Sequence, residues 1–230
     1  MNSAGKLIEL RKLILLKSQE LVPTLGFSQN LFQVAAKEIS VSPAIVGHLF
    51  PEGPIALVHH LMESWQEQLN EESSSPNLKV MNTKGKVYFY TKRRMEYIIP
   101  YKNVWKEAMT LSASPSNALN TTRILLNTWD TVLNLSGEKP LPYHYVIPQF
   151  LAARAAYGKA YLFTEVYFLT DSPDYSKTWS FLEGQIDSLY LQKSIANTFF
   201  DLAQFTLKAQ FRVLESFYPQ PRVHDNPIVK

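Results

Sequence analysis

The sequence predicts an all-α protein, and two patterns support this prediction. Apolar residues recur at intervals of three and four along most of the chain, as at Leu7, Leu10 and Ile14, and no stretch alternates long enough to indicate a strand. The Ser-Pro pairs at Ser42-Pro43, Ser114-Pro115 and Ser172-Pro173 each place a capping hydroxyl directly before a proline that the first turn of a helix tolerates. The composition, 46% apolar and 13% aromatic over 230 residues, is that of a folded chain with one main core.

The first three expected helices are closely spaced. Residues 4–22 carry a Leu/Ile stripe, residues 29–40 carry Phe32, Ala36 and Ile39 at helical spacing, and residues 43–50 begin at the first Ser-Pro pair. Gly and Pro in the intervening turns mark where the helices end. These elements predict a three-helix, helix-turn-helix-like head.

A larger bundle is expected to follow the head. Its helices are predicted at 54–70, 86–99, 101–112, 115–135, 148–170 and 174–192, with an amphipathic helix at 195–217. The stretch "NEESSSPN" after residue 69 is the best candidate for a linker. The predicted organisation is a helix-turn-helix-like head at 1–72, a helical bundle at 73–194, an amphipathic helix at 195–218 and a tail at 219–230.

Known catalytic and metal-binding patterns are absent from the sequence. The chain has no Cys, no glycine-rich phosphate loop and no G-x-S-x-G elbow, and its net charge is only +3. The one His pair, His59-His60 near Glu63, lacks the Glu-x-x-His order of a di-iron bundle and is interpreted as solvated or hydrogen-bonded. Nothing in the sequence argues for an enzyme, and we predict no enzyme activity, no catalytic or metal-binding residue and no cofactor.

The stretch from Gly5 to Met62 resembles the N-terminal region of TetR regulators. A long helix ends at Gly-Phe, a short one holds Ala-Ala, and the next ends at "HLFP". The resemblance implies that the third helix would enter a DNA groove, yet its early residues are Ala44, Ile45, Val46 and Gly47, without a cation. A DNA-binding regulator is therefore a minority alternative, and no nucleic acid is expected as a partner.

Two stretches in the later part of the chain resemble the paired signatures of the Coq-nine family. They are "RRMEYIIPYKNVWKEAMTLSASPSNAL" and "YLFTEVYFLTDSPDYSKTWSFLEGQID". The resemblance implies a TetR-like fold that binds lipid as an accessory protein of ubiquinone biosynthesis. It also implies a mitochondrial protein attached peripherally to the matrix side of the inner membrane.

The first functional hypothesis is that the chain takes up an isoprenoid quinone intermediate and presents it to a hydroxylase. An apolar pocket suits this role because burying a prenyl tail contributes roughly 0.8 kcal/mol per CH₂ group. Each candidate residue also has an alternative role as ordinary core. The resemblance implies which helices face the ligand, and the pocket candidates are taken from those helices. They are Met95, Ile98, Trp105, Met109, Leu125, Trp129, Tyr157 and Tyr161.

The expected hydroxylase-binding surface departs from the family pattern. The resemblance implies Trp-Tyr-x-Arg-Arg and a di-iron demethoxyubiquinone hydroxylase as partner, whereas this chain has "FLAAR" from Phe150 to Arg154. Phe150, Leu151 and Arg154 are the candidate partner-binding residues. Because Leu151 and Ala153 replace the implied Tyr and Arg, the second hypothesis is a structural accessory subunit of a larger mitochondrial inner-membrane complex of respiratory type.

Two further surfaces are expected from the resemblance. The amphipathic helix at 195–217 is predicted to bind membrane through Phe199, Phe200, Leu202 and Phe205. A homodimer is predicted through the regions Leu151 to Phe168 and Phe181 to Tyr190.

Overall fold

The computed structural model describes residues 3–138 and 147–192 and is helical throughout those ranges, with no strand in them. Every helix predicted there is present, so the prediction of an all-α fold is confirmed. The chain divides into two compact units, residues 1–186 and 187–230. The predicted helix at 195–217, with its membrane-binding residues, lies outside the described residues, and the site described below lies in the first unit.

The head consists of α1 (Ser3–Leu25), α2 (Leu31–Glu38) and α3 (Val46–Leu49). The predicted helix at 43–50 is a 3-10 turn, η1 (Pro43–Ile45), followed by only four α-helical residues. The turn starts at Pro43, whose φ suits a first turn, and Pro51 closes the segment. The head has its own small core, in which Phe32 stacks on Phe50 with ring centroids 4.0 Å apart.

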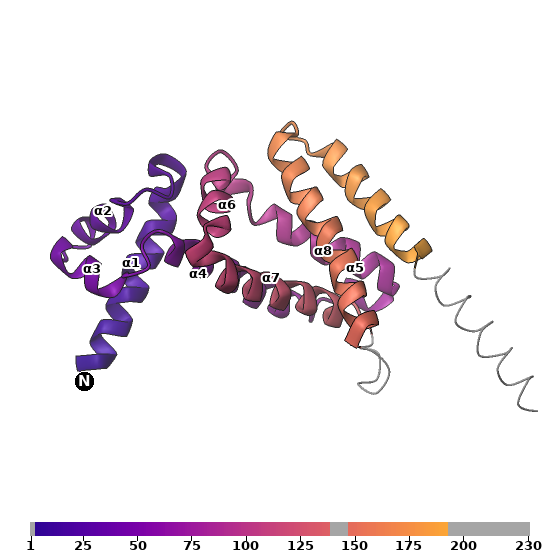
Figure 1. Ribbon diagram of the computed structural model, residues 1–230, viewed down its shortest axis with the longest axis horizontal. Helices are drawn as coiled ribbons and strands as arrows, with labels where there is room; N and C mark the ends of the chain where they lie inside the picture. The colour runs from indigo at the N-terminus through magenta and orange to yellow at the C-terminus, as the bar shows by residue number, and fades with distance from the viewer. Residues whose placement is uncertain (1–2, 139–146, 193–230) are drawn as a thin grey trace, which may run out of the picture. The chain divides into compact units, whose positions relative to one another are not determined.

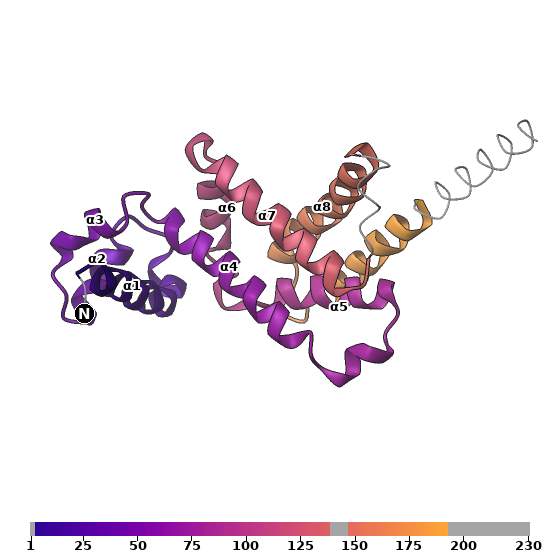
Figure 2. The ribbon, with the colours of Figure 1, turned by 90° about the horizontal axis from the view of Figure 1, so that it is seen from below.

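α4 (Ile55–Glu72) belongs to both the head and the bundle. It packs against α1 near its start and against α7 and α6 further along, as Figure 2 shows. Its first four residues are all buried, and Leu61, Trp65 and Leu69 continue at helical spacing on the bundle side. This one helix therefore positions the bundle relative to the head.

The bundle contains α5 (Thr83–Glu96), α6 (Trp105–Ala113), α7 (Pro115–Leu135) and α8 (Ile147–Thr170), with a further helix at 176–192. The 3-10 turns η2 (Pro76–Val80) and η3 (Ile99–Tyr101) precede α5 and α6. The helix at 176–192 follows α8 after a short turn and contacts it through the stacked rings of Tyr167 and Phe181. α8 in turn packs on α5 and α7.

Two predicted boundaries differ from the structure for local reasons. α5 begins at Thr83, three residues before the predicted start, because the Asn82 side chain caps it by accepting a hydrogen bond from Gly85 N at 2.8 Å. α6 begins at Trp105 and not at 101, because η3 around Pro100 occupies the preceding turn.

α8 lies close to α7 where Gly158 faces Trp129. A Cβ atom on Gly158 would lie 2.4 Å from the Trp129 ring, so only glycine allows this approach. The contact brings the buried face of α8 next to the core-facing residues of α7 and fixes the wall of the cavity described next.

Candidate functional site

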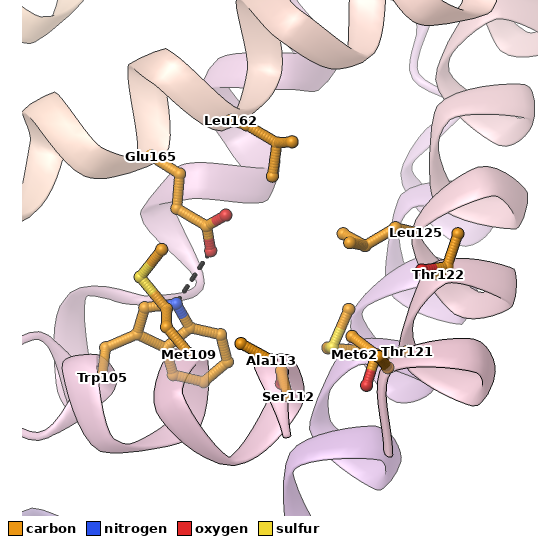
Figure 3. A pocket seen from close by; sticks show the side chains of 11 residues that line it. Met62, Trp105, Met109, Ser112, Ala113, Thr121, Thr122, Leu125, Leu162 and Glu165 are labelled. Atoms are coloured by element: carbon orange, nitrogen blue, oxygen red, sulfur yellow. Dashed lines mark hydrogen bonds between the residues drawn. The ribbon is translucent and has the colours of Figure 1, made fainter. Parts of the chain in front are cut away.

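A cavity of about 260 Å³ lies between α4, α6, α7 and α8 (Figure 3). It exceeds the roughly 150 Å³ that accommodates a benzene molecule, so a ring or a short isoprenoid segment fits inside. Most of its walls are apolar, with Met62 from α4, Leu125 from α7 and Leu162 from α8. The remaining lining residues are Trp105, Met109, Ser112, Ala113, Ala118, Thr121, Thr122 and Glu165.

A hydrogen-bonded pair forms one wall of the cavity. Trp105 Nε1, from the first turn of α6, donates to Glu165 Oε1 of α8 at 2.8 Å, and both side chains are buried. Across the cavity, Thr121 Oγ1 lies 2.9 Å from His59 Nε2 of α4. The cavity therefore combines apolar walls with a few fixed polar groups, the usual composition of a small-molecule site.

Burial raises the pKa of Glu165 above its ordinary value, because the protein interior disfavours the charged carboxylate. The Arg94 guanidinium and the hydrogen bond from Trp105 oppose this effect without cancelling it. Arg94, Glu165, Tyr157 and Tyr161 are all buried, the two tyrosine rings lie 6.4 Å apart between centroids, and the Arg94 charge opposes the rise in pKa of the other three groups. These four residues are called the buried polar cluster. Desolvation raises the pKa of both tyrosines, which stay protonated at neutral pH.

The hydrogen bonding of this cluster is incomplete. Tyr157 Oη is paired with Thr91 Oγ1 at 2.7 Å. Within residues 3–138 and 147–192, by contrast, no hydrogen-bond partner reaches Arg94 Nε, Arg94 Nη1, Tyr161 Oη or Trp129 Nε1. The Arg94 guanidinium lies over the Trp65 ring, 4.4 Å from its centroid, and its side chain is fully buried.

The predicted lipid-binding residues fall into two groups. Trp105, Met109 and Leu125 line the cavity. The other five are buried in the adjoining core and are not among the lining residues: Met95, Ile98, Trp129, Tyr157 and Tyr161. Tyr157 and Tyr161 nevertheless lie in the polar cluster that begins at Glu165, on the cavity wall.

Of the predicted partner-binding residues, Arg154 is described and forms an ion pair with Asp130 of α7. The backbone at Phe150 and Leu151 is helical, and their side chains lie outside the described part of the molecule. The ion pair joins the early part of α8 to α7, so Arg154 has a packing role, and partner binding at this residue stays a prediction.

Sequence reasoning missed Arg94 as a site residue, although a signal for it exists. Val87, Thr91, Arg94 and Ile98 follow one another at intervals of three and four, which places a cation on the apolar face of α5. Glu165 lies on the buried face of α8 between Tyr161 and Phe168. Charged residues on apolar helix faces are rare because their burial is costly, and they indicate a site more specifically than the apolar residues around them.

Residues 3–138 and 147–192 contain no cluster of three or more His, Asp or Glu side chains placed to hold a metal ion. None of the helices described is both long and apolar enough to span a membrane.

Comparison with solved structures identifies the fold. A TetR transcriptional regulator from Nitrosomonas europaea superimposes with a TM-score of 0.62 at 12% identity, over 80% of this chain and 99% of that one. The predicted TetR-like fold is thus confirmed.

Comparison with protein families and curated sequences identifies the relatives. The family model described as COQ9 matches residues 118–190. The mitochondrial ubiquinone biosynthesis protein COQ9 of Drosophila melanogaster is 28% identical over 200 residues, covering 84% of this chain and 60% of that protein. The Homo sapiens protein of the same name is 23% identical over 186 residues, covering 78% of this chain and 57% of its own. The chain spans about 60% of the length of such relatives, and the resemblance predicted from its paired motifs is confirmed: the chain has a TetR-like fold and is similar in sequence to the COQ9 proteins.

Proposed function

We propose that this chain is a non-enzymatic accessory protein of mitochondrial ubiquinone biosynthesis that binds an isoprenoid quinone intermediate. The cavity between α4, α6, α7 and α8 is the observation that carries the proposal, because its largely apolar walls and its volume of about 260 Å³ suit one end of such a lipid. The names of the curated relatives place them in ubiquinone biosynthesis and in mitochondria.

The proposed role is to take the lipid from the inner-membrane surface and present it to a hydroxylase. Removing an isoprenoid from the membrane requires an apolar site in the carrier, since transfer into water costs about 0.8 kcal/mol for each CH₂ group exposed. Met62, Leu125 and Leu162 provide such a surface. The absence of a catalytic pattern in the sequence agrees with a carrier role.

Native mass spectrometry of the purified protein tests lipid binding. Ala118 lines the cavity, whereas the adjacent Leu119 is 85% exposed. Ala118→Trp fills the cavity and is expected to abolish co-purification of isoprenoid lipid, while the matched control Leu119→Trp retains it. Thermal melts establish that both variants fold, since overpacking costs about 1–3 kcal/mol. A wild-type protein free of lipid, or equal lipid content in both variants, would contradict the proposal.

A second candidate function is that of a structural subunit docked onto a mitochondrial inner-membrane complex. The outer face of α8 favours it, because Phe163 and Val166 are each 52% exposed and Tyr167 is 37% exposed. Deletion of the gene followed by quinone profiling separates the two functions. Accumulated demethoxy precursor supports the accessory role, whereas normal quinone with loss of an assembled complex supports the structural one.

A further inference from the structure

The buried polar cluster behind the cavity wall contains hydrogen-bond donors that no group in residues 3–138 and 147–192 accepts from. Arg94 Nε, Arg94 Nη1 and Tyr161 Oη have no partner within the described part of the chain, and both side chains are fully buried. A buried donor without an acceptor costs about 1–3 kcal/mol, and a charged one costs more. A fold that retains such groups has a use for them that the unliganded chain does not show.

The cluster is continuous with the cavity through Glu165. The Glu165 carboxylate lines the cavity and is hydrogen-bonded to Trp105, which lines it as well (Figure 3). Trp65, the ring under the Arg94 guanidinium, lies 5.2 Å from Trp105 between ring centroids, so Arg94 is one aromatic ring away from the cavity wall. Tyr161 precedes Glu165 by one turn of α8, so its hydroxyl lies on the same buried helix face.

The surroundings of Arg94 are aromatic. Its guanidinium lies over the Trp65 ring at 4.4 Å, and Tyr161 lies 6.3 Å from Trp129 and 6.4 Å from Tyr157, measured between ring centroids. A flat ligand group that accepts hydrogen bonds at its edge matches donors set among aromatic faces. A ligand with an apolar tail alone would leave these donors unpaired.

We propose that Arg94 and Tyr161 form the head-group end of the site and donate hydrogen bonds to an oxygen acceptor on the ligand, with the tail in the cavity beyond Glu165 and Trp105. This inference rests on the proposed function and specifies the ligand class as a prenyl lipid with an oxygen-bearing head. A quinone ring and a phosphate both provide such oxygens. The arms of the experiment therefore vary the head and keep the tail constant.

The test is equilibrium binding by calorimetry of three ligands with a ten-carbon prenyl tail. They are ubiquinone with two isoprene units, geranyl diphosphate and the hydrocarbon myrcene, which has no head group. The wild-type protein is expected to bind at least one of the two oxygen-bearing ligands more tightly than myrcene. The ligand that shows this preference identifies the source of the oxygen.

Tyr161→Phe removes only the unpaired hydroxyl. It is expected to weaken binding of the preferred ligand about two- to tenfold, the usual value of one neutral hydrogen bond, and to leave myrcene binding unchanged. The melting temperature of the ligand-free variant is expected to be equal or higher, because the lost hydroxyl had no partner. The matched control Tyr97→Phe loses a hydroxyl that donates to Glu72 Oε1 at 2.9 Å, so it should melt lower and bind normally.

Arg94→Met in a Glu165→Gln background removes the cation without leaving a buried carboxylate alone. It is expected to weaken binding of the preferred ligand about tenfold to a hundredfold, as for a hydrogen bond from a charged donor. If the wild-type protein binds all three ligands equally, or if both variants keep full affinity, the inference is wrong and the cluster is structural. A wild-type protein that binds none of the three would overturn the proposed function as well.

Discussion

Glu165 places an ionisable carboxyl group in the protein interior, where apolar residues are the usual choice. Burying the charged carboxylate on α8 lowers the free energy of unfolding. Because burial also raises the pKa of Glu165, this loss of stability depends on pH. At pH values between the ordinary pKa of 4.5 and the raised pKa of folded Glu165, the native state binds the carboxyl proton more tightly than the unfolded state does. The free energy of unfolding therefore falls as pH rises through this interval. Below the interval the carboxyl is protonated in both states, and this loss of stability is absent.

Glu165→Gln is expected to remove this pH dependence, because an amide does not titrate and still accepts the hydrogen bond from Trp105. The melting temperature of the variant relative to wild type should rise between pH 4 and pH 7. Glu9→Gln, an exposed change on α1, is the control and should shift the melting temperature equally at both pH values. A constant difference for Glu165→Gln would show that the pKa of this carboxyl is the same in the folded and unfolded states.

The residues of the site differ in how far the sequence predicts them. Trp105, Met109 and Leu125, predicted from the helices that the family resemblance implies are on the ligand side, line the cavity. The same resemblance selects Met95 and Ile98, which are core. Periodicity identifies the buried face of a helix. The location of the cavity depends instead on how α4, α6, α7 and α8 pack, and this packing is set by contacts such as that between Gly158 and Trp129.

Besides α4, a contact at the end of α1 joins the head to the bundle. The backbone N–H of Phe27, just after α1, donates to Glu107 Oε2 of α6 at 2.9 Å, and the Phe27 ring meets Trp105 edge-on. Gly26 has φ 65° and a Cβ there would lie 2.4 Å from Glu107, so glycine is needed for both the turn and the contact. The sequence predicts this Gly-Phe turn as a helix end, but its partner, 80 residues later, is outside the reach of local patterns.

Glu107→Ala is expected to loosen this junction. The Phe27 amide loses its acceptor, which costs about 1–3 kcal/mol for a partly buried group. Amide hydrogen exchange should accelerate around Gly26 and Phe27, while the protection of α7 stays unchanged. Lys106→Ala, an exposed change next to Glu107 on α6, is the control. Unaltered exchange at Phe27 would show that ring packing against Trp105 holds the junction without the carboxylate.

At the scale of the whole molecule, the chain has a TetR-like fold, and η1 and α3 contain no Lys or Arg. Ala44, Ile45, Val46 and Gly47 occupy η1 and the start of α3, where a regulator would meet phosphates. Nearby cations are engaged within the head. Arg11 pairs with Glu52 and lies over Phe50, and Lys17 contacts both Glu20 and Glu38 at 2.9 Å.

We therefore expect no binding to duplex DNA, since phosphate contacts by Lys and Arg provide almost all of the non-specific affinity. A gel-shift titration of the full chain with mixed-sequence duplex at about 50 mM salt should show no retarded band. Ala44→Lys combined with Gly47→Lys is the positive control, because Ala44 is exposed and a side chain at Gly47 would meet open space. This double variant should gain a retarded band that weakens steeply toward about 200 mM salt, as released counterions require. Retardation of the wild-type protein with the same salt dependence would instead show that Lys37 and the cations of α1 are enough to hold DNA, and that the head keeps the regulator's activity as well as its fold.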